Sequence, residues 1–122
     1  MKRNFDLMRK ILIDIEESNP VEMYTQDFFD LSDDFDELSY SIQLLYEAGF
    51  INAYDISTCD GSYYPQYQIN WITNAGHDYL DSIRSESIWN KTKQLFFEKS
   101  LSMTFGLIQE VATKLIKSQL GI

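Results

Sequence analysis

The chain has 122 residues, of which 44% are hydrophobic and 15% aromatic, with one cysteine, two prolines and five glycines. These values exclude a disulfide-stapled scaffold, a collagen-like repeat and a low-complexity segment, and they predict one domain with a buried core. No apolar run is long enough for a signal peptide or a membrane-spanning helix. We therefore expect a cytoplasmic protein that does not bind membranes.

The net charge of −9 is unevenly distributed along the sequence. No lysine or arginine lies between Lys10 and Arg84, and residues 11–83 hold 15 acidic residues. The rest of the chain holds all 10 basic residues and four acidic ones, so an acidic body is flanked by two basic ends. The simplest interpretation is a solvated acidic surface. The alternative is a surface that attracts a basic partner, including a DNA-binding protein whose ligand it imitates by charge.

The first predicted element is a helix over residues 5–17, where apolar residues recur at helical spacing. Asn4 is its expected N-cap, and Asn19 and Pro20 end it. The next segment, residues 21–31, mixes aromatic, β-branched and acidic residues without a clean period. It fits a short strand or a short helix equally well.

A second helix is predicted to begin after Asp33 or Asp34 and to run to about Ala48, with Gly49 as its C-terminal stop. One face of this segment is apolar at helical spacing, which is typical of a helix packed on a core.

After this helix the hydrophobic period changes to two, which predicts strands over residues 50–56 and 67–72. Asp60, Gly61 and Pro65 lie between them and supply turn residues, so the strands form a hairpin with a long tip.

Three more helices are predicted in the remaining sequence. Thr73 caps one that runs to about Arg84, Ser87 caps another, and a last helix begins near Thr104 and ends before Gly121. No linker or internal repeat interrupts the chain, so we expect a single domain over residues 1–122.

The order of elements predicts an α+β, mainly helical fold: a winged helix-turn-helix-like domain with a two-stranded hairpin and a C-terminal helical extension. The expected winged-helix core covers residues 1–84 and the helical extension covers residues 85–122.

With these segments in place, the chain resembles a small family of bacterial and bacteriophage proteins known only as a domain of unknown function. The matching stretches span nearly the whole chain: Met1–Arg3, Asp6–Leu7, Arg9–Leu12, Leu44–Ile51, Trp71–Thr73, Gly76–Asp78, Ile88–Lys91 and Lys114–Gly121. The resemblance implies a winged-helix-like fold and a prophage or mobile-element setting. It supplies no activity and no catalytic residue.

Residues that could carry catalysis or bind a metal are few. His77 is the only histidine, and Asp81 is the nearby carboxylate that can share its helix face. One histidine and one carboxylate fall short of a metal cage, and Cys59 lies in a polar stretch without a partner cysteine. We therefore expect no catalytic residue, no metal site and no cofactor, and predict that the protein is not an enzyme.

A DNA-binding winged helix normally places basic residues on its recognition helix and wing. Here both predicted elements lack lysine and arginine and carry acidic residues, which repel phosphates. The usual docking mode is therefore disfavoured. The alternative is a transcriptional regulator that binds DNA through its basic N- and C-terminal segments, in particular Lys2, Arg3, Arg9 and Lys10.

The preferred interpretation is a protein-interaction module. Tyrosines gather around the hairpin and form the expected partner-binding surface: Tyr54, Tyr63, Tyr64 and Tyr67. The apolar stripe of the last helix either packs on its own domain or forms a homodimer seam, and its residues are Phe105, Ile108, Ala112, Leu115 and Ile116, with Val111 beside them. The sequence does not identify the partner.

Overall fold

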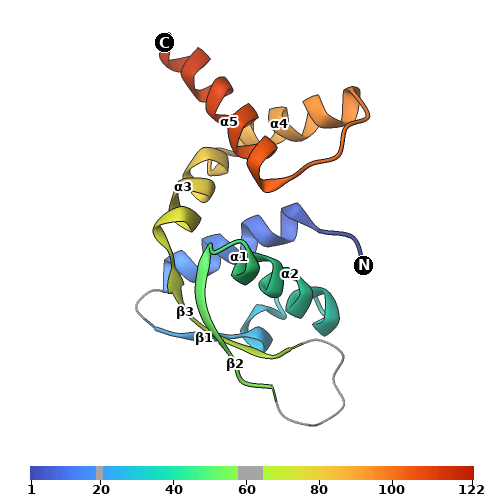
Figure 1. Cartoon of the computed structure of the whole chain (residues 1–122), viewed down its shortest axis with the longest axis vertical. Helices are drawn as coiled ribbons and strands as arrows, with labels where there is room; N and C mark the ends of the chain where they lie inside the picture. Colours follow the sequence, from blue (N-terminus) through green and yellow to red (C-terminus); the bar gives the residue numbers. More distant parts are fainter. Residues whose placement is uncertain (19–20, 58–64) are drawn as a thin grey trace. The chain divides into compact units, whose positions relative to one another are not determined.

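The computed structural model describes residues 1–18, 21–57 and 65–122 (Figure 1). The chain forms two compact units, residues 1–77 and 78–122, called unit 1 and unit 2 below. The division falls within helix α3 (Asn74–Ile83), whereas the sequence analysis divided core from extension after Arg84. Among the described residues, no helix is long and apolar enough to cross a membrane.

Unit 1 combines helices with a small antiparallel sheet. Its elements in chain order are α1 (Phe5–Ser18), β1 (Met23–Tyr24), the 3-10 helix η1 (Thr25–Phe28), α2 (Phe35–Glu47), β2 (Ile51–Asp55), β3 (Tyr67–Ile72) and the beginning of α3. The two predicted helices and the predicted hairpin are confirmed. The hairpin tip, residues 58–64, and the predicted helix stop at residues 19–20 lie outside the described residues.

The predicted helix boundaries of unit 1 rest on side-chain caps. The Leu7 amide donates to Asn4 Oδ1 at 3.0 Å, and the Glu37 amide donates to Asp34 Oδ1 at 3.2 Å. Each carboxyl or amide oxygen satisfies an amide that has no partner within its helix. Gly49 follows α2 with φ of +77°, a backbone conformation that glycine adopts without a steric penalty.

The sheet has three strands in the order β1-β3-β2, all antiparallel. The undecided segment at residues 21–31 therefore supplies both a strand, β1, and the turn η1 that follows it. The Tyr67 amide at the start of β3 donates to the buried Thr25 Oγ1 at 3.0 Å, which ties η1 to the central strand.

The core of unit 1 lies between the helices and one face of the sheet. Helix α1 contacts α2 and β3, and α2 contacts β2. The largest fully buried side chains here are Met8, Ile11, Leu12, Phe28, Leu38, Ile42, Leu45 and Ile69. Burying one such side chain contributes about 1.5–3 kcal/mol, so these contacts dominate the stability of the unit.

Unit 2 is helical. It contains the end of α3, then α4 (Glu86–Glu98) and α5 (Phe105–Leu120), which pack on each other. Helix α5 begins after Thr104, close to the predicted start; Thr104 is its N-cap and accepts from the Leu107 amide at 3.1 Å, and Gly121 follows the helix with φ of +77°. The Tyr79 and Phe105 rings are nearly perpendicular, with centroids 5.1 Å apart.

The predicted cap of α4 is wrong by two residues. Ser85, not Ser87, has the extended backbone of an N-cap, and its Oγ accepts from the Ile88 amide at 3.3 Å. Starting the helix at Glu86 leaves Ile88 and Trp89 on its buried side, and that packing decides between two serines of equal capping ability. The fold class, α+β and mainly helical, is confirmed.

Candidate functional site

The face of the sheet that points away from the core of unit 1 carries aromatic and amide side chains. Along β3 the buried residues Tyr67, Ile69 and Ile72 face the helices, while the residues between them face outward. The outward side chains of the three strands form what we call the open face: Tyr24, Asn52, Tyr54, Gln68, Asn70 and Trp71. None of the six is charged, although unit 1 as a whole is strongly acidic.

A β-bulge places Trp71 on this face. Asn52 pairs with Trp71 and Ala53 pairs with Ile69, so Asn70 is an extra residue in β3. A bulge lets two consecutive side chains point to the same side of a sheet. As a result, the Trp71 side chain is 51% exposed, whereas strict alternation after Asn70 would turn it toward the core.

The amides of the open face are held in place by one another. Gln68 Nε2 donates to Asn70 Oδ1 at 3.0 Å, and Asn70 Nδ2 donates to Asn52 Oδ1 at 2.9 Å. Each amide keeps further donor or acceptor capacity after these bonds. The open face therefore offers fixed polar groups beside two exposed aromatic rings, Tyr54 and Trp71.

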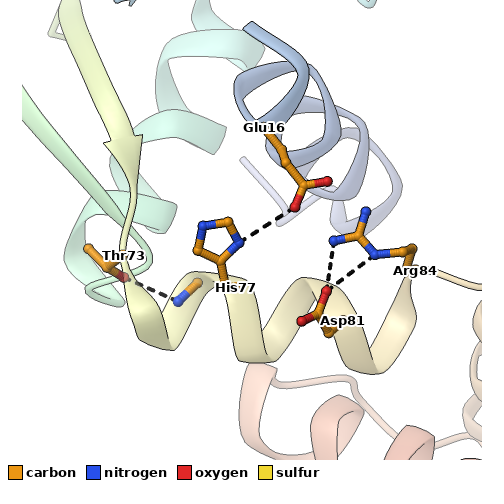
Figure 2. A network of polar contacts seen from close by, with 6 residues as sticks. Glu16, Thr73, His77, Asp81 and Arg84 are labelled. Atoms are coloured by element: carbon orange, nitrogen blue, oxygen red, sulfur yellow. Dashed lines mark hydrogen bonds and ion pairs between the residues drawn. The ribbon is translucent and has the colours of Figure 1, made fainter. Parts of the chain in front are cut away.

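A pocket of about 280 Å³ adjoins the Trp71 end of the open face. Its walls come from three elements: Ile15 and Glu16 from α1, Trp71 and Ile72 from β3, and His77 from α3. Figure 2 shows His77 and Glu16 pointing toward one another, and Nδ1 of the imidazole lies 3.5 Å from Oε2 of the carboxylate. Ile15 and Ile72 are buried and give the pocket an apolar base.

The start of α3 fixes the position of His77. Thr73 Oγ1 accepts from the Gly76 amide at 3.1 Å (Figure 2). It also donates to the Gly49 carbonyl, and the Thr73 amide donates to the Phe50 carbonyl at 3.0 Å. Gly76 lies so close to Phe50 that a Cβ there would overlap its carbonyl oxygen. These contacts anchor the first turn of α3 to the end of α2 and the start of β2.

A second group of aromatic and acidic side chains lies at the C-terminal end of α2. The Tyr46 and Tyr67 rings are tilted against each other with centroids 5.8 Å apart. Burial raises the pKa of the Tyr67 phenol, and the negative charges of Asp55 and Glu47 raise it further, as does Tyr46. Hydrogen bonds from Ser57 lower the pKa of the exposed Asp55 carboxyl.

Comparison with known proteins gives a family without an assigned activity. Residues 2–102 match the family model described as "Hypothetical protein (DUF2513)". The chain belongs to this family. A relative from Haemophilus influenzae, described as "Uncharacterized protein", is 34% identical over 99% of this chain and 100% of its own length. No solved structure matches the chain.

In this member of the DUF2513 family, the two predicted partner-binding tyrosines that the structure describes lie in different surroundings. Tyr54 is 61% exposed on the open face, whereas Tyr67 is buried on the opposite side of the sheet. Tyr63 and Tyr64 lie in residues 58–64, outside the described residues. Tyr54 is thus the one predicted partner-binding residue that the described structure places on an exposed face.

The predicted self-association residues of α5 differ in burial. Ile108 and Ala112 are fully buried, and Phe105, Leu115 and Ile116 are partly buried. The more exposed apolar side chains of unit 2 are Phe97, Leu101, Leu107, Leu120 and Ile122. A small apolar pocket of about 160 Å³ lies between α4 and α5, lined by Leu95, Phe96, Lys99, Leu101 and Val111.

The four basic residues predicted to contact DNA lie at the start of α1 and just before it. Lys2, Arg3 and Lys10 are exposed and Arg9 is partly buried. The Arg3 guanidinium lies over the Phe5 ring, 5.1 Å from its centroid.

No three His, Cys, Asp or Glu side chains of residues 1–18, 21–57 and 65–122 are grouped so as to hold a metal ion. Of the pair singled out in the sequence, His77 contacts Glu16, and Asp81 accepts hydrogen bonds from Arg84 at 2.7 and 3.2 Å (Figure 2). Cys59 lies outside the described residues.

Sequence reasoning missed Trp71 and Glu16 as site residues. Trp71 reads as one more aromatic residue of a strand, and Glu16 as one acid among many on a helix. The bulge depends on the pairing of β2 with β3, and the approach of α1 to α3 depends on a contact between Glu16 and His77, which are 61 residues apart. The sequence carries no signal for the bulge, because the polar Asn70 followed by the aromatic Trp71 also fits strict alternation in a strand.

Proposed function

We propose that this protein is a non-enzymatic interaction module that binds a basic protein partner on the open face of unit 1. The observation that carries the proposal is the exposure of Tyr54 and Trp71, at 61% and 51%, on an uncharged face of a strongly acidic unit. Exposed aromatic side chains between polar groups are typical of recognition surfaces, since they supply contact area at a low entropic cost.

The chemistry of the partner follows from charge. Unit 1 holds four basic and 14 acidic residues, whereas unit 2 holds six basic and five acidic ones. A net charge of −10 on one unit attracts a cationic surface over several ångströms and raises its association rate. Arginine also stacks on aromatic rings, so an arginine-rich surface suits both the charge and the rings.

We propose a winged-helix arrangement for unit 1. The order α1, β1, η1, α2, β2, β3 and the sheet order β1-β3-β2 support it, with η1 and α2 as the helix-turn-helix pair and the β2–β3 hairpin as the wing. In that arrangement α2 is the recognition helix. Its exposed positions include Asp36 and Glu47, which repel DNA phosphates, and this favours a protein ligand over DNA.

A screen of a random displayed peptide library against the purified chain tests the proposal. We expect the selected peptides to be enriched in arginine and lysine. Tyr54→Ala is expected to weaken their binding about tenfold, as for a residue at the centre of an interface. Tyr46→Ala is the matched control, because Tyr46 is an exposed tyrosine of unit 1 that lies on α2 instead of the open face.

Two outcomes would contradict this function. Peptides without a basic bias would refute the proposed chemistry of the partner. Equal losses for Tyr54→Ala and Tyr46→Ala would refute the open face as the binding surface. Binding should be measured at about 50 mM and about 200 mM salt, because a purely electrostatic attraction fades over that range whereas contacts with aromatic rings persist.

DNA binding through the basic ends is the second candidate, favoured by the exposure of Lys2, Arg3 and Lys10 around the first turns of α1. Titration of the chain into labelled mixed-sequence duplex DNA distinguishes it. A DNA-binding regulator would bind with a steep salt dependence that is lost on reversing the charges of Arg9 and Lys10. We expect the proposed interaction module to show no DNA binding at either salt concentration.

A further inference from the structure

We propose that the pocket between α1, β3 and α3 is a binding site for one arginine side chain of the partner. This proposal rests on the proposed function and extends it to a single contact. The pocket combines an exposed indole, a carboxylate and an apolar base in about 280 Å³, and all five lining residues belong to unit 1.

Each wall of the pocket suits one part of an arginine side chain. The Trp71 ring is half exposed, and an indole can attract a planar cation to its π-face. Glu16 supplies a carboxylate that can accept hydrogen bonds from guanidinium N–H groups. Ile15 and Ile72 are buried at 3% and 6% exposure, and they provide an apolar base for the methylene stem.

In this structure the Glu16 carboxylate faces the imidazole of His77. Its Nδ1 lies 3.5 Å from Glu16 Oε2, so the imidazole and the carboxylate form adjoining parts of the pocket wall. The imidazole is a cation only when it is protonated, whereas a guanidinium is always charged. We expect the arginine to enter beside His77 and to strengthen the attraction at the carboxylate.

The surroundings favour arginine over lysine. A guanidinium is weakly hydrated and planar, so it loses little on leaving water for a pocket that is lined by an indole and two isoleucines. An ammonium group is strongly hydrated and offers no flat surface for stacking. Residues 11–83, which form these walls, hold 15 acidic residues and no lysine or arginine, so the carboxylates of this segment attract a cation.

The test is an NMR titration of the full-length ¹⁵N-labelled chain with the capped tripeptide Gly-Arg-Gly. The reporters are the Trp71 indole N–H and the His77 amide. The buried indole of Trp89, 2% exposed, is the internal reference, and the Trp71→Phe variant assigns the two indole signals. We expect a saturable shift at about 1 mM affinity, which a titration to about 20 mM covers.

Three comparisons make the outcome decisive. The peptide with citrulline in place of arginine, which keeps the shape without the charge, should leave both reporters unshifted, and the lysine peptide should bind at least about threefold more weakly. Glu16→Gln should weaken the arginine peptide about tenfold. Glu17→Gln removes the same charge from the neighbouring exposed position of α1 and should leave the affinity within about twofold.

The proposal is overturned by any of three results: no shift of the Trp71 indole, equal binding of arginine and citrulline peptides, or equal effects of Glu16→Gln and Glu17→Gln. The outcome is separable from that of the proposed function. If the pocket fails while Tyr54-dependent basic peptides are selected, the partner uses the open face alone. If the arginine peptide binds but no such peptides are selected, the arginine site stands without the larger interface.

Discussion

Units 1 and 2 differ in net charge and in the groups that surround their exposed apolar side chains. Unit 1 carries a charge of −10 and exposes two aromatic rings on an uncharged sheet face, whereas unit 2 carries +1 and exposes aliphatic and aromatic side chains along its helices. In unit 1 the exposed rings lie among amides that are fixed by hydrogen bonds. In unit 2 they include Phe97, 85% exposed, next to the buried Phe96.

This difference between the two surfaces affects how specifically each could select a partner. Exposed aromatic groups that are surrounded by ordered polar groups can select a partner by geometry, because a wrong partner leaves hydrogen-bonding groups unpaired. Exposed aliphatic groups select by burial alone. The contrast is the reason that the proposed partner contacts lie in unit 1.

The largest expected change in stability comes from replacing one glycine in each unit by alanine. Gly76→Ala in α3 places a Cβ against the Phe50 carbonyl oxygen and 2.6 Å from Ile72 Cγ2, so backbone must shift, which typically costs about 1–3 kcal/mol. Gly106→Ala in the first turn of α5 meets nothing within 4 Å and should stabilise the chain by about 0.5–1 kcal/mol.

Urea unfolding of the two glycine variants provides the measurement. The unfolding midpoint should fall for Gly76→Ala and rise for Gly106→Ala. A rise of the midpoint for both variants would show that backbone entropy, and not the close approach of Gly76 to the Phe50 carbonyl, decides the outcome at residue 76.

A smaller effect is expected from the helix caps. Asp34→Ala removes the cap of α2, and Thr104→Ala removes the cap of α5, and each should cost about 1 kcal/mol. Asp34→Asn keeps a capping oxygen and removes a charge from the acidic unit, so it should retain stability.

Amide hydrogen exchange can follow the two caps separately. Protection should fall in α2 for Asp34→Ala and in α5 for Thr104→Ala. A loss of protection in Asp34→Asn as large as that in Asp34→Ala would mean that the charge of Asp34, and not its hydrogen bond to the Glu37 amide, stabilises α2.

The smallest expected effect concerns Asp14 of α1. Burial raises the pKa of its carboxyl, and the charges of Asp30 and Glu17 raise it further. The folded chain therefore holds the Asp14 proton more tightly than the unfolded chain does, and the ionised group lowers stability at neutral pH. Asp14→Asn should raise the unfolding midpoint at pH 7.

The gain from Asp14→Asn should shrink as the pH falls through the raised pKa and vanish below the ordinary aspartate value of 3.8, where the carboxyl is protonated in both states. Thermal unfolding at several pH values measures this dependence, with Glu110→Gln in unit 2 as the control. A stability gain of Asp14→Asn that does not depend on pH would contradict its attribution to the ionised Asp14 carboxylate.

Local signals in the sequence determined most of the elements. Asn4, Asp34, Thr73 and Thr104 are capping residues followed by apolar residues at helical spacing, and the change to a period of two marks the hairpin strands. These features act over three or four residues, and a helix cap or strand pattern needs no distant partner. The acidic character of the body was also evident from the sequence alone.

Only the tertiary structure decided the strand at β1, the cap at Ser85 and the two candidate sites. Residues 21–31 have no clean period, and Met23 and Tyr24 become a strand because β3 offers them a free edge. The bulge at Asn70 and the approach of Glu16 to His77 likewise depend on pairing between distant segments. Such pairings are set by packing of the whole core, and for that reason Trp71 emerged as a site residue only once the fold was known.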